Sequence, residues 1–149
     1  MYRRGLYPST VVERAFRFAA TVACCVVLAG CGSSEPAAVP VTGTLKFKDG
    51  TVPQGEIAMI RFEPMIADGS CPAAFAKIQS DGNYSLETAD GKKGALPGNY
   101  KVTLKIWRTY RPPHVSVVPE KYAHIETSNL EREVSEAGPN HFDLVVDSK

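Results

Sequence analysis

The sequence predicts an all-β fold, a seven-stranded antiparallel sandwich of two packed sheets that follows an N-terminal signal segment. One observation is that apolar and polar residues alternate from Val39 onward, which is the period of half-buried strands. Another is that turn signals such as Asp49-Gly50 and Ser80-Asp81-Gly82-Asn83 recur about every eight to twelve residues. No helical period longer than two turns occurs in the expected mature chain, in keeping with an all-β, immunoglobulin-like architecture.

Each expected strand has an apolar face that is directed toward the core. We expect the strands at residues 39–48, 55–63, 73–80, 84–86, 99–107, 130–134 and 142–146. The fifth has the most regular alternation, with four apolar residues from Tyr100 to Ile106 directed inward and polar residues between them. The second strand carries Ile57 and Met59 on its other face, so we expect it to be covered on both sides.

Residues 1–30 have the layout of a secretory signal. An uncharged run of thirteen residues from Phe18 to Gly30 follows Arg14 and Arg17. It is shorter than the run of about 20 apolar residues that a membrane-spanning helix needs. A basic flank before a short apolar run is typical of a signal peptide that is removed from the mature protein.

The end of this run, Leu28-Ala29-Gly30-Cys31, resembles the lipobox of bacterial lipoproteins. The resemblance implies cleavage between Gly30 and Cys31. It also implies that the Cys31 sulfur receives diacylglycerol and that the new amino group receives an acyl chain such as palmitate. Cysteine suits this role because its thiolate is a good nucleophile.

Residues 31–38 are small and polar and are expected to form a flexible tether to a domain at 39–149. Position 32 is glycine rather than aspartate, and in double-membraned bacteria this resembles lipoproteins that are sorted to the outer membrane. We therefore expect a cell-envelope protein that is attached to the outer membrane through a lipid on Cys31. The lipid is then its contact with the membrane.

The distribution of charge argues against one class of partner. The formal net charge is +1, and residues 1–30 hold four arginines and one glutamate. The remainder therefore has 13 basic and 15 acidic side chains, a balance near −2. Because no basic cluster interleaved with aromatic residues is present, we expect no nucleic-acid binding.

Four segments of the chain resemble a carboxypeptidase-regulatory-like domain, a family with a transthyretin-like (prealbumin-like) sandwich. They are Val41–Gly50, Ala58–Pro64, Ser80–Leu86 and Leu96–Val102. The tail, from Val118 to Leu144, resembles a subgroup of short bacterial lipoproteins of unknown role. The resemblance covers residues 39–147 and consists mostly of turns and core positions, so it implies a fold and no particular activity.

The loop at residues 108–129 is the candidate recognition surface. Its 22 residues exceed the usual connection, and long loops on rigid sandwiches often carry binding sites. The candidate binding residues are Trp107, Arg108, Tyr110, His114, Tyr122 and His124. The alternative is a packing role, in which Val117, Val118 and Tyr122 hold an arm on a sheet edge and block edge-to-edge association.

The residues supply no metal or catalytic motif. His114, His124 and His141 are ten and seventeen residues apart, whereas zinc ligands usually have shorter spacings. No nucleophile elbow is present, and Cys71 would be the one thiol left after processing at Cys31. We therefore expect a non-catalytic module, without a cofactor, that binds or assembles with an envelope protein or glycan. A metal-binding or enzymatic protein that uses the 108–129 loop stays open as the alternative.

Overall fold

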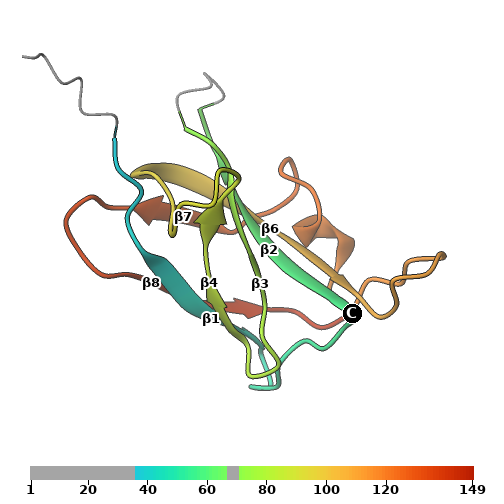
Figure 1. Ribbon diagram of the computed structural model, residues 1–149. Coiled ribbons are helices and arrows are strands. Elements are labelled where there is room, and N and C mark those ends of the chain that lie inside the picture. Colours follow the sequence, from blue (N-terminus) through green and yellow to red (C-terminus); the bar gives the residue numbers. More distant parts are fainter. Residues whose placement is uncertain (1–35, 67–70) are drawn as a thin grey trace, which may run out of the picture. The chain divides into compact units, whose positions relative to one another are not determined.

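The computed structural model describes residues 36–66 and 71–149, which contain two β-sheets (Figure 1). The strands are β1 (Val41–Phe47), β2 (Ile57–Pro64), β3 (Ala74–Lys77), β4 (Asn83–Ser85), β5 (Glu87–Thr88), β6 (Gly98–Trp107), β7 (Glu131–Val134) and β8 (Asn140–Val146). A short 3-10 helix, η1 (Glu120–Tyr122), precedes β7. The signal segment 1–30, the Gly30–Cys31 cleavage site and residues 31–35 of the tether lie outside the described residues.

The two sheets have three and five strands. Their orders are β4-β1-β8 and β5-β3-β2-β6-β7. The longest antiparallel pairing joins β2 to β6, from Ile57 opposite Trp107 to Pro64 opposite Tyr100. The fold is therefore all-β, as the alternation predicted, and the described residues contain no α-helix.

The core lies between the sheets and contains inward-facing residues of both. Phe62 on β2 lies at its centre, with its ring centroid 5.9 Å from that of Tyr100 on β6. Across the core, the Phe62 centroid is 6.4 Å from that of Tyr84 and 6.1 Å from that of Phe142, which belong to the three-stranded sheet. Gly43 on β1 leaves room for the Tyr84 ring, whose hydroxyl donates to the Phe142 carbonyl at 2.7 Å. These aromatic contacts hold the two layers face to face.

The expectation of a wholly antiparallel sandwich is wrong for one pair of strands. β1 and β8 are parallel, from Val41 opposite Asn140 to Phe47 opposite Val146. Turn signals set the direction of strands that a short loop joins, whereas most of the domain separates β1 from β8. The remaining strand pairs of the described residues are antiparallel.

The described residues contain eight strands rather than the seven expected, because the unexpected β5 (Glu87–Thr88) follows the fourth strand, which was expected at 84–86. β4 pairs with β1, whereas β5 pairs with β3 in the other sheet. Leu86, between them, is buried and donates its backbone N–H to the Val41 carbonyl at 3.0 Å. The chain thus passes from one sheet to the other at Leu86.

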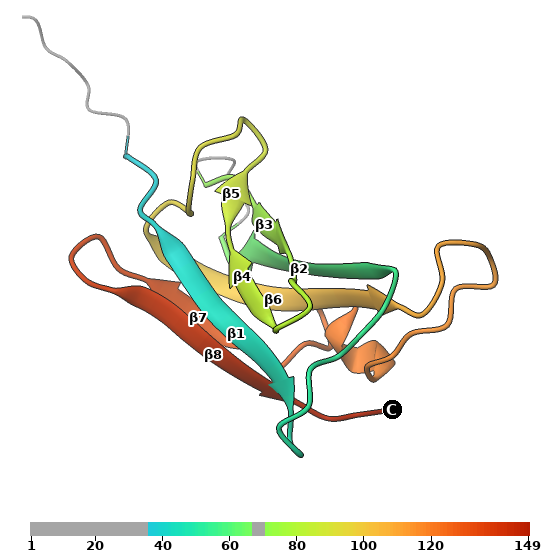
Figure 2. The ribbon, with the colours of Figure 1, turned by 60° about the horizontal axis from the view of Figure 1, so that its bottom comes forward.

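The start of the domain and residues 108–116 lie at opposite ends of β6 (Figure 2), whereas residues 117–129 run back along that strand. Val39 exchanges two backbone hydrogen bonds with Ala95, of 2.8 and 3.0 Å, just before β6 begins. β6 has ten residues and is therefore about 33 Å long. Within the described ranges, no helix is long and apolar enough to span a bilayer.

Candidate functional site

A groove of about 530 Å³ lies on the outer face of the five-stranded sheet. Its floor consists of outward-facing side chains of β2, β3 and β6, and neighbouring loops supply its walls. Its apolar lining includes Met59, Pro72, Ala73, Phe75, Ala89 and Ala123, and its polar lining is Arg61, Glu63, Thr103 and Lys105. The volume falls in the range of about 300–1,000 Å³ that is typical of ligand sites.

Met59 on the groove floor is 40% exposed, so the expectation that β2 is covered on both sides is wrong. The three-stranded sheet packs on the inner face of β2, where Phe62 meets Tyr84 and Phe142. The outer face of β2 carries Met59 and Arg61 into the groove. The apolar second face of β2 is therefore part of an exposed groove, and the described residues contain no further layer that covers it.

The strand register sets the charge of the groove. Lys77 on β3 and Lys105 on β6 lie on either side of Met59, because both are its partners in the sheet. Arg61 places its Nε 2.9 Å from Oε1 of Glu63. Among the residues that the structure describes, no carboxylate lies within 4 Å of the Lys77 or Lys105 amino group. Lys105 therefore lines one end of the groove as a cation without a carboxylate partner among the described residues, and Lys77 lies beside it outside the lining.

Residues 108–116, which we call the hairpin, project beyond the end of β6 (Figure 2). Trp107 and Ser116 form a bridge at its base, and Arg108 donates its backbone N–H to the Val115 carbonyl at 2.9 Å. The ring of Trp107 stacks on that of His114, with centroids 4.0 Å apart and planes 12° apart. The base of the hairpin is therefore held by both backbone and side chains.

The tip of the hairpin is exposed but connected to the body of the domain. Tyr110 donates its backbone N–H to Oε2 of Glu56 at 2.7 Å, while its side chain is 71% exposed. The guanidinium groups of Arg108 and Arg111 have no carboxylate within 4 Å among the described residues. The hairpin thus presents an aromatic ring and the cations Arg108 and Arg111 to solvent, and binding surfaces are enriched in aromatic residues and arginine.

Residues 117–130, which we call the arm, run back along β6 beyond β7. Val117 donates its backbone N–H to the Ile106 carbonyl at 2.8 Å, and the Ser128 hydroxyl donates to the Val102 carbonyl at 2.5 Å. Val118 in the arm is fully buried. The arm therefore covers the edge of β6, which is the packing role considered above for this part of the loop.

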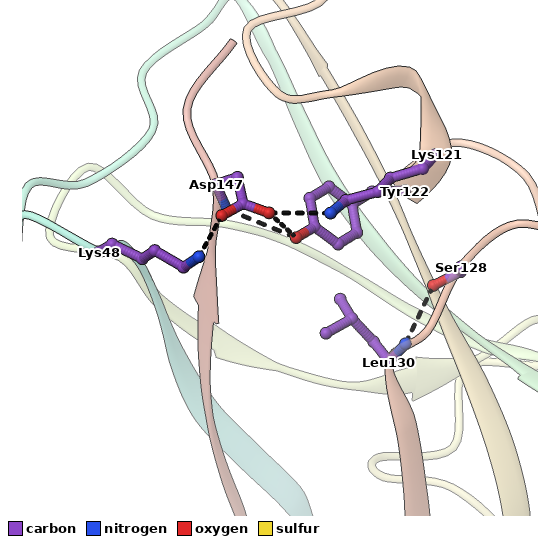
Figure 3. Close-up of polar contacts among 6 residues, drawn as sticks. All are labelled: Lys48, Lys121, Tyr122, Ser128, Leu130 and Asp147. Carbon is purple, nitrogen blue, oxygen red and sulfur yellow. Dashed lines mark hydrogen bonds and ion pairs between the residues drawn. The ribbon is translucent and has the colours of Figure 1, made fainter.

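Asp147, just after β8, fixes the arm to the three-stranded sheet (Figure 3). Its Oδ1 lies 2.5 Å from Nζ of Lys48, which follows β1, and its Oδ2 lies 2.8 Å from Nζ of Lys121 in η1. The Tyr122 hydroxyl donates to the same Oδ2 at 3.0 Å. One carboxylate thus joins the ends of β1 and β8 to the arm.

The hydrogen bonds to Asp147 change the acidity of the groups involved. Those from Lys121, Lys48 and Tyr122, in that order, hold the pKa of Asp147 well below its ordinary value. The pKa of Lys121 is raised in turn, chiefly by its hydrogen bond to Asp147. Both shifts favour the ionised forms, so the cluster is a set of charge-assisted hydrogen bonds at ordinary pH.

The six predicted binding residues divide between the hairpin and the arm. Trp107, Arg108, Tyr110 and His114 lie together at the base and tip of the hairpin. Tyr122 is instead buried in the arm, with its hydroxyl on Asp147. His124 is exposed in the arm, with Nε2 3.5 Å from Oε1 of Glu120.

The groove itself was missed in the sequence. Its signals were the apolar Met59 on the second face of a strand and the alternating lysines of β6. Each signal is ordinary alone, because exposed strand faces often carry lysine or a single apolar residue. Only the pairing of β2 with both β3 and β6 brings Lys77, Met59 and Lys105 into one row.

A second polar cluster lies on the outer face of the three-stranded sheet. Thr42 Oγ1 is 3.1 Å from Nδ1 of His141, and the Thr44 hydroxyl donates to Oδ1 of Asp143 at 2.6 Å. His141 Nε2 is also 3.3 Å from that carboxylate oxygen. Thr42 lies opposite His141 and Thr44 opposite Asp143 in the parallel register, so these contacts follow from strand pairing.

Two further groups with reactive or ligating atoms have local partners. Cys71 is half-buried, with its Sγ 2.8 Å from the Tyr100 hydroxyl, which also lies 2.8 Å from the Leu96 carbonyl. Burial, followed by the contact with Cys71, raises the pKa of Tyr100.

No three His, Cys, Asp or Glu side chains within the described ranges converge as metal ligands would.

Comparisons of the chain with models of protein families, with curated proteins and with solved structures found no match.

Proposed function

We propose that this chain is a lipid-anchored, non-catalytic binding protein of the bacterial cell envelope. In this proposal a lipid on Cys31 attaches it to the outer membrane, and a carboxypeptidase-regulatory-like, transthyretin-like sandwich holds an envelope protein or glycan. The observation that carries the binding role is the groove, a largely apolar hollow on a rigid sheet, lined by Lys105 with Lys77 beside it in the same row. Sites with an apolar lining and few polar groups are typical of ligand binding.

The position of the hairpin supports this role. The domain begins beside Ala95, before β6, while Trp107 and the hairpin lie at the far end of that strand, about 33 Å away. The tether of eight residues, 31–38, can span at most about 28 Å. An anchor at Cys31 would therefore leave the hairpin free to reach a partner away from the anchoring bilayer.

The rigidity of the surroundings also supports binding rather than a spacer role. The groove floor belongs to the three central strands of the five-stranded sheet, and the arm that carries Ala123 is held by Asp147. A preformed surface loses little conformational freedom when it binds a partner. A simple spacer would need neither the groove nor the projecting hairpin.

Site-specific photo-crosslinking in cells tests the binding role. We place a photoreactive phenylalanine analogue at Phe75 in the groove, at Tyr110 on the hairpin, or at Val145, which is 58% exposed on the other sheet. The proposal predicts one adduct of defined mass from Phe75 or Tyr110 and none from Val145. Equal labelling from all three positions, or no adduct from any, would contradict it.

A further inference from the structure

We infer that the groove binds a polysaccharide that carries carboxylate groups. This inference rests on the binding role proposed above and names the chemistry of the ligand. It draws on the charge of the groove, on its apolar floor and on its shape.

The charge at one end of the groove favours an anionic ligand. Lys105 lines the groove, and three further cations lie outside its lining: Lys77 across Met59 on β3, and Arg108 and Arg111 in the hairpin. Among the described residues, none of the four has a carboxylate within 4 Å. Because like charges repel and exposed cations attract anions, this end is complementary to a ligand with repeated negative groups.

The opposite end of the groove limits how much negative charge the ligand can carry. Glu63 lines the groove there, and its Oε1 is 2.9 Å from the Arg61 Nε. Glu131 on β7 lies opposite Lys101, the partner of Glu63 on β6. A chain with one single charge on each unit suits such a mixed surface better than a densely charged polymer.

The floor favours sugar rings. Phe75 and Met59 supply apolar surface, and Thr103 and Arg61 supply hydrogen-bonding groups within the same groove. A pyranose ring has C–H groups on its faces and hydroxyl groups at its edges. Its faces can therefore pack on the apolar pair, and its hydroxyl groups can form hydrogen bonds with Thr103 and Arg61. Binding sites commonly combine an apolar floor with a few polar groups in this way.

The same surface is poorly suited to two other partners. Among the exposed large apolar side chains of the described residues, only Met59 lines the groove, whereas the centre of a protein interface contains several such anchors. A bilayer surface is flat, and the groove is a hollow between β3, β6 and the arm. We therefore assign the groove to a glycan.

The test uses the full chain, purified with its anchor in detergent, and the fluorescence of Trp107. Trp107 is the single tryptophan of the chain, and its ring lies 5.1 Å from the Lys105 amino group. The probe is an oligogalacturonate, a linear sugar chain with one carboxylate on each unit. Its comparisons are the methyl ester of the same length and poly-glutamate.

The inference predicts that the oligogalacturonate binds about tenfold more tightly than its neutral ester and that added salt weakens binding. The double variant Lys77→Gln/Lys105→Gln should lose about tenfold in affinity. The matched variant Lys46→Gln/Lys149→Gln removes two exposed lysines that do not line the groove and should bind as the unaltered chain does.

Equal affinity for the ester, equal or tighter binding of poly-glutamate, or no binding of the acidic glycan would each overturn the inference. If the chain does not bind oligogalacturonate but still forms the crosslinks from Phe75 or Tyr110, the inference fails while the proposed binding role stands. Absence of those crosslinks would instead remove the binding role itself.

Discussion

At the scale of single residues, Ser128 is a buried polar side chain on which the position of the arm depends. Its hydroxyl donates to the Val102 carbonyl at 2.5 Å and accepts from the Leu130 backbone N–H at 3.4 Å (Figure 3). Both groups lie where the arm meets β6 and β7. Loss of the hydroxyl would leave a buried carbonyl of β6 without this donor.

Ser128→Ala should lower the free energy of unfolding by about 1–2 kcal/mol, because a buried acceptor then lacks its hydrogen bond. Urea denaturation followed by circular dichroism measures this change. Ser148→Ala, at an exposed position near the end of the chain, is the matched control and should leave the midpoint unchanged. Equal stability of both variants would mean that the Ser128 hydroxyl does not fix the arm.

Asp147 makes stability depend on pH in a defined direction. Its pKa is lowered in the folded state, whereas an unfolded aspartate has a pKa near about 3.9. Its contribution is therefore fully present above that value and is lost as the pH falls below it.

Asp147→Asn should therefore be less stable than the unaltered chain at pH 7, and the difference should shrink below about pH 4. Thermal unfolding across this pH range measures the difference. Glu136→Gln, at an exposed loop position, is the control and should show no such trend. A difference that is constant between pH 3 and pH 7 would contradict the role given to the carboxylate.

At the scale of elements, the hairpin owes its shape to the stack of His114 on Trp107. The two rings lie 4.0 Å apart, and Lys105 reaches the same indole from β6. Among the described residues, the tip of the hairpin forms one hydrogen bond to the body of the domain, from the Tyr110 backbone N–H to the Glu56 carboxylate. It should therefore open locally without unfolding the sheets.

His114→Ala should shift the emission of Trp107 to longer wavelength, because water then reaches the indole face. It should also speed tryptic cleavage after Arg108 several-fold, with little change in the midpoint of global unfolding. His124→Ala, which removes an exposed histidine of the arm, should do neither. Unchanged emission in His114→Ala would show that the stack does not hold the hairpin.

Local patterns predicted those elements whose side chains alternate and whose neighbours follow a short turn. The alternation from Tyr100 to Ile106 marked β6, and the expected inward residues Phe142, Leu144 and Val146 all lie on β8. The parallel pairing of β1 with β8 was not predictable, because no turn connects them. The sheet change at Leu86 was hidden because the alternation continues through it.

The candidate site was predictable in part. The loop residues Trp107, Arg108, Tyr110 and His114 do meet in the hairpin, since they are close in sequence around one bridge. The groove needed the register of three strands that are distant in sequence, which alternation alone does not give. Tyr122 could not be separated from the exposed aromatics, because its partner Asp147 is 25 residues away.

At the scale of the whole molecule, we expect a membrane anchor that precedes the domain, which carries the groove on its five-stranded sheet and the hairpin beyond the end of β6. The domain supplies the groove and the hairpin, and the sequence motif at Leu28–Cys31 supplies the expected anchor. The distance of about 33 Å along β6 matters only if the chain is attached where the domain begins. Attachment through Cys31 is therefore the claim on which the proposed role depends.

The most direct test is mass spectrometry of the mature protein from bacterial membranes, with Cys31→Ala as its control. We predict an N-terminal residue Cys31 that carries diacylglycerol on its sulfur and an acyl chain on its amino group, and these three chains give stable membrane attachment. It predicts no lipid on Cys31→Ala. A mature chain that retains residues 1–30, or that begins at Cys31 without lipid, would contradict the account.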